Sequence, residues 1–361
     1  MIARNSPLWA GYRYATAMVA RNSPLWAGYE CETAMVTRNS PLWAGLMIVT
    51  LPFDSIFDFN GKARPGRGTM DAGMHDRKEY DPMSTIYWFQ GRFLPKEEVR
   101  ISPDDRGYYF GDGVYEVFRV YGGMLFEEEA HYERLRKSAE GTRIELPDLA
   151  DTATKLRELV KLNEVADGTV YVQVTRGEAP RNHLFPLRAA PVTMAYCTST
   201  PRPIAAMEQG IHTVTTPDIR WLRCDLKTLN LLPNALFKQY ALDHDASDVI
   251  FHRDGIVTEC SASNLFIVQG GALVTHPANH LILKGVTRDV VIRIAREAGI
   301  PALERPFSLH ELAQAEEAFV TGTTVEITPV ISIDGRPVGS DGPGLLTRKL
   351  QQLFYQRIGN L

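Results

Sequence analysis

The sequence predicts an α+β fold in two domains, a small α+β domain over residues 83–201 and a larger β-rich, barrel-like domain over residues 202–361. Three observations support this prediction. Short apolar stretches separated by glycines recur along the chain, as in antiparallel hairpins. Amphipathic stretches with helical spacing interrupt them in both halves. Two prolines in the stretch TSTPRPI separate the halves, as an interdomain linker would.

The expected small domain opens with two strands around the Gln90-Gly91 turn of STIYWFQGRFLP. A strand is expected over residues 114–121, followed by a turn and a short strand in GGMLFE. Residues 127–141 and 151–166 have the spacing of amphipathic helices. The stretches TVYVQVTRG and PVTMAYCTS add two strands. Hairpins with two helices on one side are typical of a small α+β domain.

The second half is richer in strands than the first. Strands are expected in IHTVTTPDI, DVIFHRDGIVTE, SNLFIVQGGALVTH and AFVTGTTVEITPVISIDG. Two helices, over residues 233–244 and 287–298, interrupt them. This pattern predicts a barrel-like sheet with helices packed outside it.

The first 82 residues have a different character. The segment ARNSPLWAGY begins at Ala3 and again at Ala20, and TRNSPLWAGL begins at Thr37, so the period is 17 residues. This period matches no common structural repeat, and a proline in each copy stops a helix from running through. Residues 1–82 are therefore expected to be a disordered or artefactual extension, with Met83 as the biological start. The alternative is a short binding motif around the repeated tryptophans.

Composition limits the class of function. A hydrophobic content of 44% and a charged content of 23% are ordinary for a globular protein. The net charge of −4 and scattered basic residues favour neither nucleic acid nor a membrane surface as partner. The apolar run over residues 46–53 is too short to cross a bilayer. Four cysteines without paired spacing indicate neither a disulfide framework nor a metal site, so we expect a cytoplasmic protein that acts on small molecules.

Two stretches could bind a phosphate. Gly285 stands just before a helix that opens near Thr287, and the free N–H groups of a helix N-terminus attract anions. The loop TGTT, residues 321–324, offers Gly322 for close approach and the hydroxyls of Thr323 and Thr324. Glycine before a helix and hydroxyl-rich turns are both common, so an ordinary structural role is the alternative for each.

An amine and a carboxylate are further candidates. Lys227 ends a strand-like stretch, IRWLRCDLKTLN, among aromatic and apolar neighbours. An amine in such surroundings loses its proton more readily and can attack a carbonyl group. Glu259, in VTECSASN, ends a strand and could keep a pyridine nitrogen protonated. A solvated lysine and a capping or salt-bridged glutamate are the alternatives.

A Gly/Pro-rich loop, TRGEAPRNHLFP, gathers Arg176, Arg181 and His183. Convergent donors of this kind suit a carboxylate, which a guanidinium can bind through two hydrogen bonds. The alternative is a solvated basic loop.

The order of these motifs carries a resemblance. The run DRGYYFGDGVYEVFRVY, HYERLR, VTRGEAPRNH, DIRWLRCDLKTLNLL, VTECSASN, THPANHLILKGVTRD and TTVEITPV resembles the D-amino-acid aminotransferases of the fold type IV pyridoxal-phosphate family. Branched-chain aminotransferases and aminodeoxychorismate lyases belong to the same family. The resemblance covers residues 83–361 and none of residues 1–82. It implies pyridoxal 5'-phosphate as cofactor, and D-amino acids and 2-oxo acids as substrates.

The resemblance also implies a role for each residue of the motifs. Lys227 would hold the cofactor as a Schiff base and shuttle the proton at the substrate Cα, and Glu259 would face the pyridine nitrogen. Leu283 would pack on the cofactor ring. The phosphate would lie against Arg134, Val286, Thr287 and Thr323. The substrate carboxylate would lie against Tyr115, Arg181 and His183, the last two from the neighbouring subunit of an obligate homodimer.

The chain departs from the family pattern at two positions. Gly322 and Ala262 stand where the family often has hydroxyls, which implies fewer hydrogen bonds around the phosphate. Arg119 stands where branched-chain aminotransferases carry a functional arginine. An L-branched-chain aminotransferase and an aminodeoxychorismate lyase therefore remain alternatives, and so does a non-enzymatic scaffold that carries the repeats as a binding module.

Overall fold

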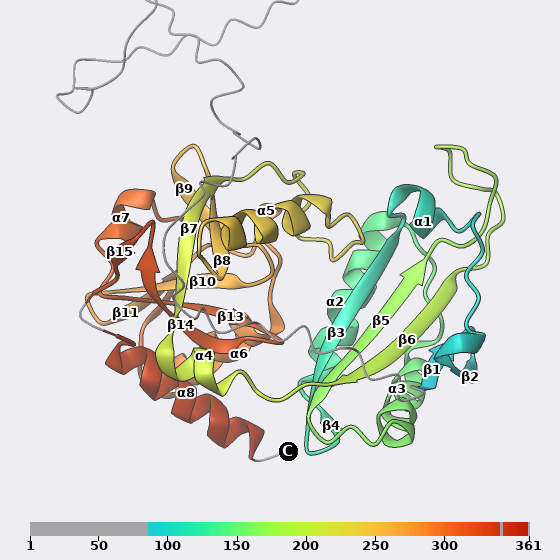
Figure 1. Cartoon of the computed structure of the whole chain (residues 1–361), viewed down its shortest axis with the longest axis horizontal. Coiled ribbons are helices and arrows are strands. Elements are labelled where there is room, and N and C mark those ends of the chain that lie inside the picture. Colours follow the sequence, from blue (N-terminus) through green and yellow to red (C-terminus); the bar gives the residue numbers. More distant parts are fainter. Residues whose placement is uncertain (1–85, 340–341, 360–361) are drawn as a thin grey trace, which may run out of the picture. The chain divides into compact units, whose positions relative to one another are not determined.

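The computed structural model describes residues 86–339 and 342–359. The expected extension over residues 1–82 lies outside the described residues. Six strands of the described chain form the first sheet, in the order β2-β1-β6-β5-β3-β4, with every pairing antiparallel (Figure 1). These strands are β1 (Ile86–Phe89), β2 (Arg92–Pro95), β3 (Gly113–Tyr121), β4 (Met124–Leu125), β5 (Gly168–Thr175) and β6 (Val192–Ser199). We call this part, residues 86–199, the small lobe.

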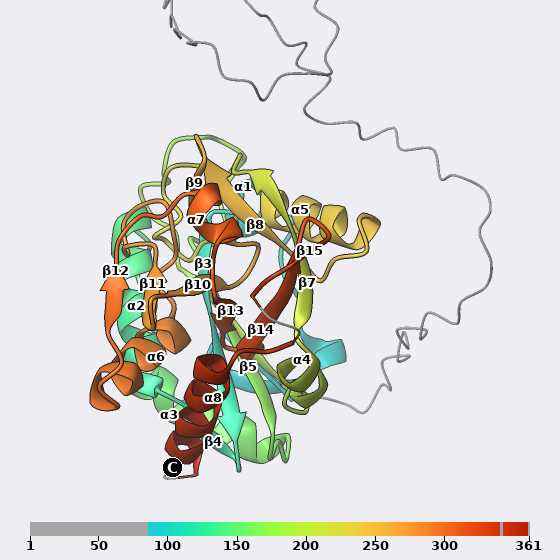
Figure 2. The ribbon, with the colours of Figure 1, turned by 90° about the vertical axis from the view of Figure 1, so that its left-hand side faces the viewer.

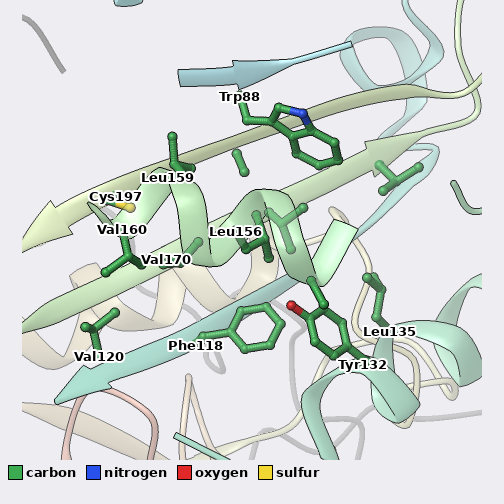
Figure 3. Packing of buried hydrophobic residues seen from close by; sticks show 14 of the residues in the cluster. Trp88, Phe118, Val120, Tyr132, Leu135, Leu156, Leu159, Val160, Val170 and Cys197 are labelled. Carbon is green, nitrogen blue, oxygen red and sulfur yellow. The ribbon is translucent and has the colours of Figure 1, made fainter. Parts of the chain in front are cut away.

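Two helices, α2 (Glu128–Thr142) and α3 (Leu149–Leu162), cover one face of this sheet. The Asp148 side chain accepts hydrogen bonds from the first N–H groups of α3, which fixes where that helix begins. Side chains from both helices pack on those of the sheet (Figure 3); the labelled ones include Phe118, Tyr132, Leu135, Leu156, Leu159 and Val170. A short helix, α1 (Arg106–Phe110), precedes β3.

The second sheet belongs to the large lobe, residues 204–359. Its order is β12-β11-β10-β13-β14-β7-β8-β9, with β15 paired to β14. The strands are β7 (Ile211–Pro217), β8 (Asp248–Arg253), β9 (Ile256–Cys260), β10 (Asn264–Gln269), β11 (Ala272–Thr275), β12 (Ala302–Glu304), β13 (Glu317–Gly322), β14 (Glu326–Ile333) and β15 (Arg336–Pro337). β9 and β10 are far apart in this order, yet they are in contact and only three residues join them. The sheet therefore curls back on itself into the barrel-like half that the sequence predicted.

Helices pack on the outside of this curled sheet. α6 (Val286–Glu297) and α8 (Leu345–Ile358) contact each other and the sheet strands (Figure 2), where they bury Val291, Phe266, Phe319 and Phe354 in one cluster. The other helices are α4 (Ile204–Gln209), α5 (Leu232–Asp243) and α7 (Leu309–Ala313). None of the helices in the described part of the chain is long and apolar enough to cross a membrane.

The predicted fold class is confirmed, and most predicted elements match the observed ones to within a few residues. The prediction of two helices in the second half was wrong, because α4, α7 and α8 are also present there. α4 and α7 have six and five residues, too few for a helical period to stand out.

Candidate active site

A cavity of about 510 Å³ is lined by residues of both lobes. Its volume is in the usual range for a small-molecule site. Eight of the predicted site residues line it, namely Tyr115, Arg134, Lys227, Glu259, Leu283, Val286, Thr287 and Thr323. These residues are separated by as many as 208 positions in the sequence, so it is the fold that brings them together.

Lys227 lies in an irregular segment between β7 and α5, so the prediction that it ends a strand was wrong. The small lobe holds its backbone on both sides: its carbonyl accepts a hydrogen bond from Tyr115 N (3.1 Å), and its N–H donates one to Ser138 Oγ (3.0 Å). These two hydrogen bonds stand in place of the strand pairing that the apolar residues before Lys227 had predicted. The Lys227 Nζ atom lies 4.1 Å from the centroid of the Tyr115 ring. The amine is thus anchored at the junction of the lobes, against an aromatic face.

Arg134 extends from α2 toward the first turn of α6. Its Nε and Nη2 atoms donate to the two oxygens of Glu116 (2.7 and 2.9 Å), and Nη1 donates to the carbonyl of Lys284 (3.1 Å). Glu116 is fully buried and also lies 2.8 Å from His131 Nδ1. Burial by itself raises the pKa of Glu116, but Arg134 and His131 outweigh it and hold that pKa well below its usual value. The paired carboxylate therefore fixes the direction of the Arg134 guanidinium.

The first turn of α6 and the end of β13 line the cavity with groups that suit an anion. In the part of the chain that the structure describes, no side chain caps the N-terminus of α6, so its first N–H groups remain available. A Cβ atom at Gly285 would lie 2.1 Å from Asn264 Oδ1, so a larger residue there would displace the Asn264 side chain. Across the cavity, Thr321 Oγ1 is buried and has no hydrogen-bond partner among the described residues. Free N–H groups at the N-terminus of a helix, with an unpaired hydroxyl on the same cavity, suit a phosphate.

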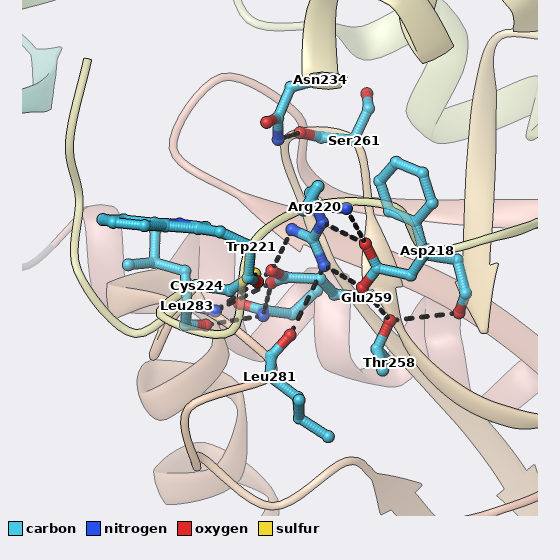
Figure 4. A network of polar contacts seen from close by, with 12 residues as sticks. Asp218, Arg220, Trp221, Cys224, Asn234, Thr258, Glu259, Ser261, Leu281 and Leu283 are labelled. Atoms are coloured by element: carbon cyan, nitrogen blue, oxygen red, sulfur yellow. Dashed lines mark hydrogen bonds and ion pairs between the residues drawn. The ribbon is translucent and has the colours of Figure 1, made fainter. Parts of the chain in front are cut away.

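Glu259 lies at the end of a buried ionic network (Figure 4). Arg220 Nη1 donates to Glu259 Oε1 (2.6 Å), and Arg220 also forms a two-pronged ion pair with Asp218. Asn264 Nδ2 and the backbone N–H of Leu283 donate to the same glutamate (2.9 and 3.1 Å). Burial raises the pKa of Glu259, and the Arg220 guanidinium opposes that rise. A carboxylate held in this way can accept a proton or a hydrogen bond from a ring nitrogen.

Arg181 and His183 are not among the described residues that line the cavity. Both are exposed on the loop between β5 and β6, where they lie beside the Phe110 ring, 5.3 and 5.4 Å from its centroid. Arg176, from the same loop, is buried and paired with Asp112. The chain by itself therefore does not bring the predicted carboxylate-binding pair to Lys227.

The cavity fits pyridoxal 5'-phosphate. This cofactor needs an amine for its aldehyde, a carboxylate for its ring nitrogen and donors for its phosphate. The chain presents Lys227, Glu259 and the first turn of α6 with Arg134 around one cavity. The orphaned hydroxyl of Thr321 adds a donor that the sequence analysis did not assign.

Several residues that build the site were not singled out from the sequence. Four of them hold the predicted site residues in place through hydrogen bonds to partners 5 to 89 positions away along the chain. They are Glu116, Ser138, Arg220 and Asn264. Arg220 lies in the same stretch as Lys227, IRWLRCDLKTLN, seven residues before it, but only the structure shows that it is buried. The others give no sign in the sequence, because their role depends on the partner they meet.

Comparison with known proteins gives a consistent result. Residues 113–333 match the family model of amino-transferase class IV. The D-alanine aminotransferase of Staphylococcus epidermidis is 44% identical over 276 residues, which are 76% of this chain and 98% of that protein. The D-alanine aminotransferase of Bacillus licheniformis is 43% identical over 271 residues, which are 75% and 96% of the two chains.

Solved structures share the fold. The branched-chain amino acid aminotransferase of Escherichia coli is 26% identical and has a TM-score of 0.72, over 76% of this chain and 94% of that one. The T.th. branched-chain amino acid aminotransferase, solved with pyridoxamine 5'-phosphate, is 26% identical with a TM-score of 0.70, over the same shares. The branched-chain aminotransferase of Thermoproteus uzoniensis is 29% identical with a TM-score of 0.68, over 76% and 95% of the two chains.

Proposed function

The chain belongs to the aminotransferase class IV family, and from that premise we propose that it moves the amino group of a D-amino acid such as D-alanine to 2-oxoglutarate, giving pyruvate and D-glutamate. It is a pyridoxal-phosphate-dependent aminotransferase. The observation that carries the proposal is the single cavity that joins an anchored lysine, a buried carboxylate and a phosphate cradle in a relative of D-alanine aminotransferases.

The predicted site residues that line the cavity have the following parts in the proposal. Bound pyridoxal phosphate supplies an electron sink that weakens the Cα–H bond of the attached amino acid. Lys227 would hold the cofactor and then move the proton at the substrate Cα. Glu259 would keep the ring nitrogen protonated, with Arg220 holding the carboxylate ionised. Arg134, Thr323 and the N–H groups of Val286 and Thr287 would hold the phosphate, and Leu283 would pack on the ring.

Stereochemistry depends on where the substrate carboxylate is held. The proposed trap consists of Tyr115 in the cavity together with Arg181 and His183 from the loop between β5 and β6. The guanidinium of Arg181, the imidazole of His183 and the hydroxyl of Tyr115 suit a carboxylate. A fixed carboxylate determines which face of the substrate presents its Cα–H bond to Lys227.

The proposal includes a homodimer, in which Arg181 and His183 reach the cavity of the neighbouring subunit. Exposed apolar side chains support it. Several of them belong to the loop, to α1 and to the segment that lines part of the cavity, namely Leu184, Phe185, Leu187, Tyr108, Trp221, Leu222 and Leu232. Such an apolar surface is typical of an obligate interface. We also place the protein in the cytoplasm, since the cysteines in the described residues are buried free thiols.

The substrate assay tests the activity. Purified protein with pyridoxal phosphate and 2-oxoglutarate is given D-alanine or L-leucine as amino donor, with Lys227→Ala as the inactive control. Pyruvate from D-alanine alone is the expected result. Turnover of L-leucine alone would move the protein to the branched-chain side, and turnover of neither would favour a lyase that needs no oxo-acid acceptor.

Subunit complementation tests the shared site. Lys227→Ala and Arg181→Ala are each expected to be inactive as homodimers, whereas co-refolded mixtures should recover about a quarter of the wild-type activity, because half of the dimers are mixed and one site in each is intact. No recovery in dimers that form normally would place Arg181 outside the neighbouring site.

A further inference from the structure

The loop between β5 and β6 carries Arg181 and His183, and its residues from 181 to 185 are all exposed. A loop that must present two side chains to a substrate needs an anchor that its own exposed residues cannot supply. We propose that Arg106, a buried arginine of α1, is a positioning residue that fixes this loop and thereby the geometry of the carboxylate trap. The proposal rests on the proposed function and adds a residue outside the cavity to it.

The base of the loop is closed by backbone contacts with α1 and the residues before it. The N–H of Arg106 donates to the carbonyl of Gly177 (3.0 Å), and the N–H of Ala179 donates to the carbonyl of Asp104 (3.2 Å). Figure 1 shows the loop beside α1 at the end of β5. Gly177 has a φ of +99°, and a Cβ atom there would lie 1.9 Å from the carbonyl oxygen of Ala190. The backbone at the start of the loop, at Gly177, therefore lies so close to the backbone at its end, at Ala190, that only glycine fits at position 177.

The side chain of Arg106 reaches further along the loop. Its Nη1 atom donates to the carbonyl of Asn182 (2.6 Å) and lies 3.4 Å from that of Leu184. Asn182 stands between Arg181 and His183 in the sequence, so this guanidinium holds the backbone at the point from which both side chains leave. Arg106 is only 3% exposed, which means that the contact is made by a desolvated charge and is stronger than a surface contact.

Asp112 holds the guanidinium in place. Its Oδ2 atom accepts from the Nε atoms of both Arg106 and Arg176 (2.8 Å each), and Oδ1 accepts from Arg176 Nη2 (2.9 Å). Arg176 in turn donates to the carbonyls of Thr142 and Arg143 at the end of α2. The anchor of the loop is thus tied to the helix that carries Arg134.

An aromatic ring completes the support. Phe110, at the end of α1, lies beneath the Arg106 guanidinium (4.8 Å to the ring centroid) and also next to Arg181 and His183. One element, α1, therefore contacts both members of the trap and the backbone between them. Helix α1 has this place because Asp105 caps its N-terminus and accepts a hydrogen bond from Thr175 at the end of β5.

The test uses the holoenzyme of the full chain and the variants Arg106→Met and Arg106→Lys. Steady-state kinetics give KM and kcat for D-alanine at saturating 2-oxoglutarate, and hydrogen exchange reports the amides of residues 178–188. Arg106→Met is expected to raise KM about tenfold or more with a smaller effect on kcat, and to speed exchange in the loop. Arg106→Lys, which keeps one donor group, is expected to give a KM and a rate of loop exchange between those of the wild type and those of Arg106→Met. The absorbance of the bound cofactor should stay unchanged, since Arg106 is outside the cavity.

Arg157→Met is the matched control, because Arg157 is an exposed arginine that pairs with Glu128 on another surface of the small lobe. It should change neither KM nor loop exchange. A KM within twofold of wild type, or unchanged exchange, in Arg106→Met overturns the proposal. If Arg106→Met does not fold, Arg106→Lys and Asp112→Asn decide by the same readouts. If the wild type does not use D-alanine, the proposed function fails, and hydrogen exchange still decides whether Arg106 holds the loop.

Discussion

Glu116 provides a direct test of how the small lobe holds Arg134, the arginine proposed to bind the cofactor phosphate. It lies on β3, faces α2 and is fully buried, and its carboxylate accepts hydrogen bonds from two nitrogens of Arg134 and pairs with His131. The substitution Glu116→Gln keeps the size of the side chain and removes its charge. It also turns one acceptor oxygen into an NH₂ group that faces other donors.

The expected loss of stability is large. Breaking a buried ion pair by removing one partner costs about 3–5 kcal/mol, because the other charge stays buried and unpaired. The Arg134 side chain is 10% exposed and borders the cavity, so water can reach it in part, and we expect about 3 kcal/mol. A guanidinium that is free to turn should also bind phosphate less well. The Kd of pyridoxal phosphate should rise about tenfold, which corresponds to about 1.4 kcal/mol.

Urea unfolding of the cofactor-free protein measures the stability, and titration with pyridoxal phosphate measures the affinity. The matched control is Glu133→Gln, since Glu133 forms an ion pair with Arg136 on α2 in which both side chains are exposed. It should leave the unfolding free energy close to the wild-type value, because an ion pair between exposed side chains contributes little. If Glu116→Gln costs no more than this control and leaves the cofactor affinity unchanged, Glu116 does not prepare Arg134.

Three further outcomes are expected. The pKa of Glu116 is held below its unfolded value of 4.5, so the contribution of this carboxylate to stability is present above pH 4.5 and is lost as the pH falls. In the wild type, the unfolding free energy should therefore fall below about pH 4.5, and Glu116→Gln should make that fall less steep. Gly177→Ala should cost about 1–3 kcal/mol in urea unfolding and expose the loop to proteolysis, because its φ is positive and Ala190 blocks a Cβ atom; an unchanged midpoint would contradict this. Arg220→Met should leave Glu259 buried without its cation, raise the pKa of Glu259 and lower kcat about 100-fold, while an unaltered kcat would remove Arg220 from the site.

The sequence predicts well the order of the strands along the chain and the residues that line the cavity. It predicts less well the hydrogen-bond and ion-pair partners that hold those residues in place. Lys227, Glu259 and Gly285 each stand in a local motif, and their motifs occur in a recognisable order. Arg220 stands in the same stretch as Lys227, but the sequence gives it no role, because neighbouring residues do not show whether an arginine is buried or exposed. Glu116 was missed for a related reason: it follows the predicted site residue Tyr115 but points to the opposite face of β3, where α2 supplies its partners.

The same alternation along β3 bears on substrate preference. Tyr115, Val117 and Arg119 share the face of β3 that points away from α2, so Arg119 was a reasonable candidate for contacting the substrate. Within the described residues, however, it does not line the cavity: it is buried, donates to the carbonyl of Thr200 (3.0 Å) and lies 5.3 Å from the centroid of the Tyr121 ring. An arginine in this place supports the linker between the lobes. Under the proposed function, the loop carrying Arg181 and His183, with the Arg106 anchor beneath it, is the first place where substitutions should alter the selection between D- and L-substrates.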